Sequence, residues 1–457
     1  MSRRPSPARK PPPPARVTIH HIGAEGDGLA RLPDGTPLYV PGALPDETVQ
    51  AEPLRPRGDG WIARAVAIDT PSPDRVAPPC PRFGACGGCT LQHWATQAYA
   101  AWKRGLLETS LRRAGFDTLP EIAFHPGMPG ERRRLDFAVR RASGQGHGQG
   151  HGQGNGQGQG TGGGIILGLH RAGSADVENL PDCLVLHPAL SGLLTPLRAA
   201  LAGLAAIRRE ASLIVNLLDS GPDLLLRTDA DPSAADRSAL ATFCGTHGIP
   251  RLSWARGAGK PETLCLLRPA VTNLSGIAVR PPPGAFLQAT REGEAAIIAA
   301  VQAGLPQRLT ARSRVADLYA GCGTLGFALA PSARVAAFEG DADALAALKA
   351  AVNGAGMAGR VEATQRDLAR QPLSAKELSG FAAIVLDPPH AGAGPQAAQI
   401  AASGVPVVIH VSCNPATLSR DAAPLRQAGY RLQAATAIDQ FVWSARMESV
   451  CVFHKPR

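Results

Sequence analysis

From about residue 284 onward, short apolar runs alternate regularly with helical segments. The runs that have the composition of β-strands read RVADLYA, RVAAFEG, RVEATQRD, FAAIVLDPP, VPVVIHVSC, YRLQAATAID and SVCVFHK. Such alternation is typical of a parallel sheet with helices on both faces, because each parallel crossover needs a connection of helix length. The sequence therefore predicts an α/β fold with a doubly wound sheet over residues 284–457.

The chain has 457 residues, which is more than one hydrophobic core usually organises. Residues 1–16 are Pro-rich and basic, as in a disordered tail. Residues 17–72 hold short β-type runs separated by turns, which predict a small β-barrel. Residues 73–283 mix helical and strand patterns and predict a central α+β domain, interrupted by a flexible Gly/Gln/His loop at residues 143–164.

The charge balance favours a polyanionic partner. Lys and Arg number 47 against 37 Asp and Glu, a formal net charge of +10. Phosphate contacts release counterions, so such an excess suits nucleic acid, although a solvated basic surface is an alternative. No apolar run reaches the roughly 20 residues of a membrane span, and the N-terminus lacks the apolar core of a signal peptide. We therefore expect a cytoplasmic protein that binds nucleic acid and no membrane, and a monomer fits a substrate of that size.

The first motif with chemical content is DLYAGCGTLGF, residues 317–327, in which a strand runs into an acid and a Gly-rich turn. The glycines let a ligand approach the backbone closely. Glu339 closes the next strand, where a carboxylate can accept hydrogen bonds from ribose hydroxyls. Asp367 ends the third strand, where such folds contact adenine. Phosphate-loop patterns fit poorly, whereas the DxxxGxG turn resembles that of class I S-adenosylmethionine methyltransferases.

Two further motifs end the fourth and fifth strands. In LDPPH, residues 386–390, two prolines fix an extended turn that exposes Asp387. VSCNPAT, residues 411–417, puts Cys413 at the carboxyl edge of the sheet, where doubly wound folds place their chemistry. A lone cysteine is usually a small buried hydrophobe, but the polar neighbours on both sides weaken that interpretation here.

A cysteine and a base are the groups needed to methylate C5 of uracil. Thiolate addition to C6 gives C5 carbanion character, and a base must later remove the C5 proton so that the thiol can leave. Glu448 in ARMESV, just before the last strand, is the candidate base.

Together these motifs resemble the RNA uracil-C5 methyltransferase family over nearly the whole chain. The resemblance implies a Rossmann-like class I methyltransferase fold with S-adenosylmethionine as donor, Cys413 as nucleophile and Glu448 as base. Gln288 in FLQAT would help to hold donor and target. The other residues that the resemblance assigns to the donor site are Tyr319, Gly321, Thr324, Glu339, Asp367 and Asp387.

Four positions depart from the family pattern. Thr290 stands where an Asn is usual, His390 where an Arg is usual, His410 where a Tyr is usual and Arg446 where a His is usual. The nucleophile and the base are retained, so the departures concern contacts to the target base and to RNA.

CPRFGACGGC spaces three cysteines as C-x5-C-x2-C, and a fourth follows at a distance; they are Cys80, Cys86, Cys89 and Cys183. Four thiolates can hold zinc or an iron–sulfur cluster. The lopsided spacing is similar to the 4Fe–4S site of the larger bacterial ribosomal-RNA members, which also begin with a small OB-like RNA-binding barrel called TRAM. We therefore expect a structural 4Fe–4S cluster, with zinc as the alternative.

The same resemblance implies that the product is 5-methyluridine in 23S rRNA, since members that act on tRNA typically lack the barrel and the cluster. The same chemistry on tRNA is one alternative, and a non-catalytic iron–sulfur RNA-binding assembly factor is another. A cytosine-C5 enzyme fits less well, because those enzymes resemble a Pro-Cys design where this chain has Pro388 and Pro389.

Overall fold

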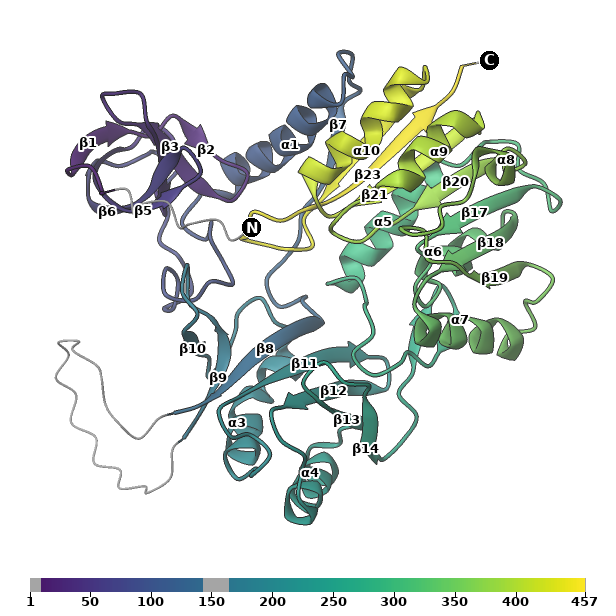
Figure 1. Ribbon diagram of the computed structural model, residues 1–457, viewed down its shortest axis with the longest axis horizontal. Helices are drawn as coiled ribbons and strands as arrows, with labels where there is room; N and C mark the ends of the chain where they lie inside the picture. The colour runs from purple at the N-terminus through teal and green to yellow at the C-terminus, as the bar shows by residue number, and fades with distance from the viewer. Residues whose placement is uncertain (1–9, 143–163, 457) are drawn as a thin grey trace, which may run out of the picture.

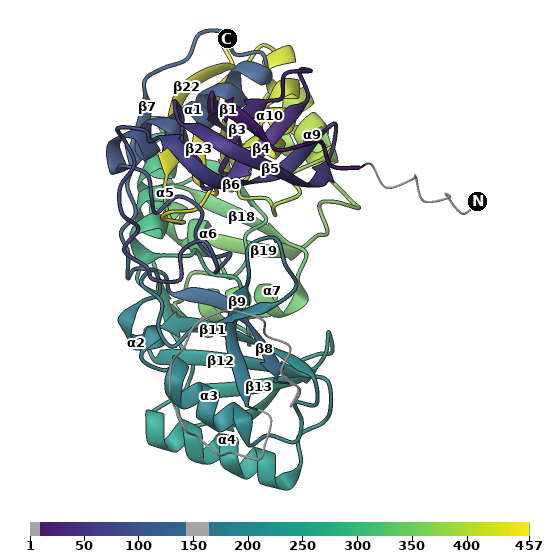
Figure 2. The same ribbon diagram turned by 90° about the vertical axis from the view of Figure 1, so that its left-hand side faces the viewer.

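The computed structural model describes residues 10–142 and 164–456. Most of the predicted tail and of the predicted Gly/Gln/His loop thus lies outside the described residues. Three β-rich regions follow one another along the chain, and Figure 1 shows them as separate lobes. In the turned view of Figure 2 the first of them overlaps the C-terminal one. Among the described residues, no helix combines the length and the apolarity that a bilayer crossing needs.

The first lobe is a curled half-barrel, which confirms the predicted small β-barrel. Its sheet has the order β1-β5-β6-β4-β3-β2 and does not close among the described residues. Alternate residues of β5 point inward and pack on Leu38 and Trp61, as a strand with one buried face requires. The strands are β1 (Ala15–Thr18), β2 (His21–Ile22), β3 (Asp27–Arg31), β4 (Pro37–Pro41), β5 (Thr48–Arg57) and β6 (Gly60–Thr70).

The central lobe is the expected mixture of helices and strands. Its sheet has the order β10-β9-β8-β11-β12-β13-β14, and helices α3 and α4 contribute leucines to the core on one face. The strands are β8 (Arg134–Arg141), β9 (Ile165–His170), β10 (Val177–Asn179), β11 (Glu210–Leu218), β12 (Gly221–Thr228), β13 (Arg251–Arg256) and β14 (Glu262–Leu266). The helices are α2 (Pro188–Ser191), α3 (Leu194–Ala202) and α4 (Ala234–His247), and a hairpin of β15 (Thr272–Leu274) and β16 (Ile277–Val279) follows.

The C-terminal lobe contains all of the strands predicted for it. The sheet order is β19-β18-β17-β20-β21-β23-β22-β7. Its strands are β7 (Ile122–His125), β17 (Arg314–Leu318), β18 (Arg334–Glu339), β19 (Val361–Gln365), β20 (Ala383–Leu386), β21 (Val407–Ser412), β22 (Arg431–Ile438) and β23 (Glu448–His454). Its helices are α1 (Thr96–Arg113), α5 (Arg291–Ala303), α6 (Thr324–Leu329), α7 (Ala342–Gly354), α8 (Ala375–Leu378), α9 (Pro395–Ser403) and α10 (Pro415–Gln427).

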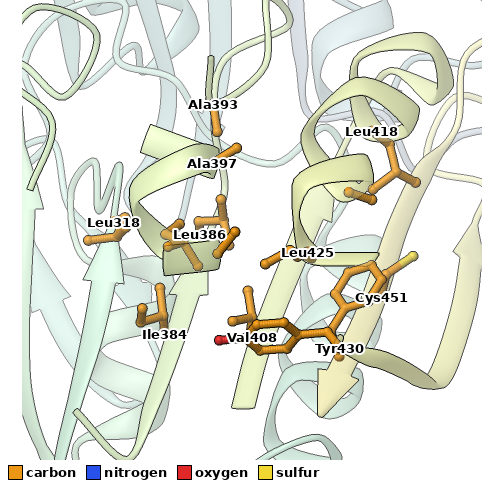
Figure 3. Packing of buried hydrophobic residues seen from close by; sticks show 14 of the residues in the cluster. Leu318, Ile384, Leu386, Ala393, Ala397, Val408, Leu418, Leu425, Tyr430 and Cys451 are labelled. Carbon is orange, nitrogen blue, oxygen red and sulfur yellow. The ribbon is translucent and has the colours of Figure 1, made fainter. Parts of the chain in front are cut away.

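Helices cover both faces of this sheet, as the prediction of a doubly wound sheet requires. Neighbouring residues of one strand belong to opposite cores: Ala316 packs in the core with α1, α9 and α10, and Val315 in the core with α5, α6 and α7. Figure 3 shows the first of these cores, to which Leu386 of β20 and Leu418 and Leu425 of α10 contribute.

Two features of this lobe differ from the prediction. The sheet is mixed, because β23 runs antiparallel to both β21 and β22. The connection between β22 and β23 holds no helix, and a parallel return would need a longer crossover. In addition, α1 packs on the sheet and β7 pairs with β22, although both lie within the range predicted for the central domain. Local sequence patterns do not indicate which of two sheets a segment joins.

Candidate active site

The carboxyl ends of five adjacent parallel strands bring most of the predicted site residues to one edge of the sheet. Strand β18 ends at Glu339. The residues that directly follow β17, β20 and β21 are Tyr319, Asp387 and Cys413, respectively. The fifth strand, β19, leads to Asp367. Ligands of doubly wound folds bind outside this edge, so the geometry agrees with a donor site there.

The Gly-rich turn after β17 has the backbone that the motif predicts. Tyr319, Gly321 and Gly323 all have positive φ, at 63°, 56° and 101°. A Cβ on Gly323 would come within 2.6 Å of side chains of Phe327 and Leu348, so only glycine fits at this position. The turn delivers Thr324 to the first position of α6.

Glu339 ties the end of β18 to the Gly-rich turn. Its Oε2 accepts a hydrogen bond of 2.7 Å from the amide of Gly321, and its Oε1 accepts one of 2.7 Å from the amide of Asp341. The Tyr319 hydroxyl donates to the carbonyl of Ala393 at 3.3 Å, in the segment that follows LDPPH. Asp367 is exposed, and its Oδ1 accepts hydrogen bonds from the amides of Ala369 and Arg370 in its own turn.

Three carboxyl groups meet at this edge, and none of them has a cationic partner among residues 10–142 and 164–456. Burial raises the pKa of Asp317 to about 8, and the nearby charge of Asp387 adds to this effect. Burial likewise raises the pKa of Asp387 to about 7. Burial and the charge of Asp387 raise the pKa of Glu448 well above its usual value. Ionised together, these groups would repel one another, and a cationic ligand would relieve that repulsion. The sulfonium and ammonium groups of S-adenosylmethionine fit this requirement.

Two buried glutamines connect these carboxyl groups. Gln440 donates through Nε2 to Oε2 of Glu448 at 2.7 Å and to Oε1 of Gln288 at 2.8 Å. Gln288 donates through Nε2 to Oδ2 of Asp387 at 2.9 Å. The Oε1 atom of Glu448 has no hydrogen-bond partner within residues 10–142 and 164–456. Glu448 thus offers one unengaged oxygen while the other is held in place.

Cys413 and Glu448 lie side by side at the end of the ladder. Ser412 of β21 is paired with Ser449 of β23, so the next residues on each strand are Cys413 and Glu448. Burial raises the pKa of the half-buried Cys413 thiol to about 12, and the charges of Glu448 and Asp387 reinforce this. The thiol is therefore protonated at neutral pH in the ligand-free protein.

The positions of Glu448 and Gln440 depend on residues that sequence reasoning missed. Lys103 of α1 is fully buried, forms an ion pair with Asp439 and donates to the carbonyl of Arg446 at 2.6 Å. Burial lowers the pKa of Lys103 to about 8. Lys103 thus contacts both ends of the connection between β22 and β23, which contains Gln440 and leads into Glu448. The only signal in the sequence is the polar Asp-Gln pair directly after an apolar strand.

A second support comes from the central lobe. Arg133 is buried, donates through Nη2 to Glu294 at 2.6 Å and through Nε to the carbonyl of Gln288 at 3.0 Å. The Thr290 hydroxyl accepts a hydrogen bond of 2.9 Å from the amide of Gly293 and so caps the N-terminus of α5. Threonine at this position therefore has a structural role. Both interactions fix the segment that carries Gln288.

Two more of the four departures are His410 and Arg446. His410 is buried, with Nε2 3.6 Å from Oδ2 of Asp421, and Asp421 accepts from the amide of Ala393 at 2.6 Å. Arg446 is exposed at the end of the connection before β23.

The four cysteines of the predicted metal site come from two irregular segments and are all half-buried. Burial raises the pKa of Cys89 to about 12, and the charges of Cys183, Cys86 and Cys80 contribute. The thiols are therefore close enough to interact electrostatically. Within the described part of the chain, however, no three Cys, His, Asp or Glu side chains converge on a position for one metal ion.

Comparisons with known proteins agree with this geometry. Residues 310–456 match the model of the tRNA (Uracil-5-)-methyltransferase family. An RNA methyltransferase of Caulobacter vibrioides is 39% identical over 96% of this chain and 99% of its own. A similar protein of Rhizobium meliloti is 38% identical over 96% of this chain and 99% of its own. The 23S rRNA (uracil(1939)-C(5))-methyltransferase RlmD of Chromohalobacter salexigens is 33% identical over 95% of this chain and 88% of its own.

The fold is shared with a crystal structure. The Pyrococcus abyssi tRNA (uracil-54, C5)-methyltransferase, in complex with S-adenosyl-L-homocysteine, superposes with a TM-score of 0.69 at 19% identity, over 96% of this chain and 100% of that one. The relatives above are at least 33% identical to this chain over nearly its full length, which is similar enough for membership of one family. The chain therefore belongs to the family of S-adenosylmethionine-dependent RNA uracil-C5 methyltransferases.

Proposed function

We propose that this protein methylates C5 of a uridine in 23S rRNA, with Cys413 as nucleophile and Glu448 as base. The observation that carries the proposal is that Cys413 directly follows β21 while Glu448 begins the neighbouring β23, at the edge of the sheet where the Gly-rich turn follows β17. The likeness to RlmD over nearly the full length, half-barrel included, supports rRNA as the substrate.

In this mechanism the Cys413 thiolate forms a bond to C6 of uracil, and the electron pair of the C5=C6 bond moves toward C5 and O4. Bound S-adenosylmethionine supplies an electrophilic methyl group. After C5 has been methylated, the unengaged oxygen of Glu448 removes the C5 proton. The C5=C6 bond then forms again and the C6–S bond breaks, which returns the thiolate. The hydrogen bonds from Gln440 to Glu448 and from Gln288 to Asp387 would hold the two carboxyl groups in position during these steps.

The donor site that we propose comprises Gln288, Tyr319, Gly321, Thr324, Glu339, Asp367 and Asp387. Glu339 would give up its hydrogen bond from the Gly321 amide and accept hydrogen bonds from the ribose hydroxyls instead. The buried acids would face the cationic groups of the donor. Asp367 follows β19, the outermost of the five strands and the one farthest from β21 in the sheet order, where we place the adenine end of the donor.

We further propose that Cys80, Cys86, Cys89 and Cys183 hold a 4Fe–4S cluster. A single zinc ion needs its sulfur ligands about 2.3 Å from one point, whereas a cluster spreads its thiolates over four iron atoms. The four thiols lie close enough to interact electrostatically, and the spacing of the cysteines along the sequence favours a cluster over zinc. The cluster would link the two segments and would have a structural role, because methyl transfer needs no electron transfer. Iron and sulfide content after anaerobic purification tests this, and one zinc per chain would contradict it.

A tRNA substrate is the second candidate, favoured by the fold shared with a tRNA methyltransferase. The test is nucleoside mass spectrometry after incubation with donor and either unmodified 23S rRNA or unmodified tRNA. We expect 5-methyluridine in the 23S rRNA alone. Its appearance in tRNA alone would overturn the substrate assignment and leave the chemistry intact. No product with either RNA, from protein that carries its cluster, would favour a non-catalytic RNA-binding assembly factor.

A further inference from the structure

We propose that His390 acts on the nucleophile: its Nδ1–H donates a hydrogen bond to the sulfur of Cys413 and stabilises the thiolate. The proposal rests on the proposed role of Cys413 and adds a residue to that site. His390 follows β20, and Cys413 follows β21, so the two side chains leave neighbouring strands at the same edge. The distance from Nδ1 to Sγ is 3.7 Å, which suits a hydrogen bond to sulfur.

Asn414 determines which ring nitrogen carries the proton. Its Oδ1 accepts from the amide of Ala416 at 3.0 Å as the N-cap of α10, so its amide nitrogen is turned toward His390. That nitrogen lies 3.1 Å from the carbonyl oxygen of His390 and 3.3 Å from its Nε2. An amide nitrogen only donates, so Nε2 is the acceptor and is unprotonated. In the neutral imidazole the proton is then on Nδ1, the atom that faces the sulfur.

The surroundings of Cys413 explain why such a donor matters. Burial raises the pKa of its thiol to about 12, and the negative charges of Glu448 and Asp387 work in the same direction. Arg446 opposes them only weakly, as an exposed cation. The start of α10, directly after Cys413, also favours a thiolate. A neutral N–H donor stabilises the sulfur anion without becoming charged itself. On ionisation the thiol proton goes to solvent and the Nδ1 proton stays on the ring.

This assignment differs from a thiolate–imidazolium pair. In such a pair the ring would take the thiol proton and both nitrogens would be donors. The contact between Nε2 and the Asn414 amide would then be repulsive, since two donors would face each other. The geometry therefore points to a neutral ring and to a thiolate that forms only at alkaline pH or once ligands bind.

The test is the pH dependence of Cys413 alkylation by iodoacetamide in the full chain, followed by mass spectrometry of the peptide that contains Cys413. The reaction forms an S–C bond and releases iodide, and its rate follows the thiolate fraction. In His390→Ala we expect the apparent pKa of Cys413 to rise by about one unit, so that the rate at a fixed pH below it falls roughly tenfold. His390→Gln retains an N–H donor and should fall between the two. His247→Ala, an exposed histidine at the end of α4, is the control and should match the wild type.

An unchanged or lowered apparent pKa in His390→Ala would overturn the proposal. A wild-type thiolate already present at about pH 5 would also overturn it, because it would indicate an imidazolium partner. Alkylation needs no turnover, so the result is independent of the proposed function. If Cys413→Ala still methylated RNA, the nucleophile assignment would fail even with the predicted alkylation profile. If Cys413→Ala were inactive but the profile of His390→Ala were unchanged, only the role of His390 would fail.

Discussion

The cysteines for which we propose functions fall into two groups that are positioned in different ways. Cys413 follows a fully buried strand in the interior of the C-terminal sheet, and the ladder to β23 places it beside Glu448. Cys80, Cys86, Cys89 and Cys183 lie in irregular segments, which isolated bridges and single hydrogen bonds connect to their surroundings. The fold itself thus fixes the proposed nucleophile, whereas we expect the positions of the four thiols to depend on the cluster that we propose. The two groups should therefore respond differently to substitution.

The sharpest test of this contrast replaces one cysteine from each group. Cys413→Ala should lower turnover by on the order of 10⁴ or more with little change in stability, because the nucleophile is lost but β21 keeps its ladder. Cys183→Ala should lose iron and thermal stability, while the folded fraction still binds donor. Cys265→Ala, a half-buried thiol in β14, is the matched control and should leave both unchanged. If Cys413→Ala and Cys183→Ala lost turnover and stability to the same extent, the two groups of cysteines would not differ in the way that we propose.

The supports of the catalytic edge give a second prediction. Lys103→Met leaves Asp439 buried without its cation, so we expect the free energy of unfolding to fall by about 3–5 kcal/mol. The connection that carries Gln440 should loosen as well, which would lower turnover in the remaining folded protein. Lys260→Met removes only an exposed pair with Asp343 and should cost less than about 1 kcal/mol. Chemical denaturation measures both, and similar values for the two variants would show that the buried pair has no special role.

The smallest expected effect is the pH dependence of donor affinity. With pKa values of about 8 and about 7, Asp317 and Asp387 bind protons at low pH and are ionised at higher pH. A cationic donor binds the ionised form better, so its affinity should rise roughly tenfold from about pH 6 to about pH 8. Calorimetry with S-adenosylhomocysteine, which lacks the sulfonium charge, should show a weaker trend. Identical trends for the two ligands would mean that the sulfonium does not sense these acids.

The sequence predicts the strand ends of this site well, because each motif follows an apolar run and the carboxyl ends of parallel strands share an edge. It does not predict the supports. Lys103 and Asp439 are separated by 336 positions, and no local pattern indicates that a helix before the central lobe will pack beside the last strands. The mixed sheet was missed for a similar reason, since strand direction depends on how each connection packs. His390 stood out only as a departure from a family pattern, and its contact with Cys413 emerges from the fold.

The central claim is that Cys413 attacks the uridine and Glu448 releases it. The most direct measurement uses Glu448→Gln with donor and unmodified 23S rRNA, followed by nuclease and protease digestion and mass spectrometry. We predict a methylated uridine nucleotide bound to the peptide that contains Cys413, because without the base the C5 proton stays and the C6–S bond cannot break. An adduct on another residue, or unimpaired 5-methyluridine formation with no adduct, would contradict the claim.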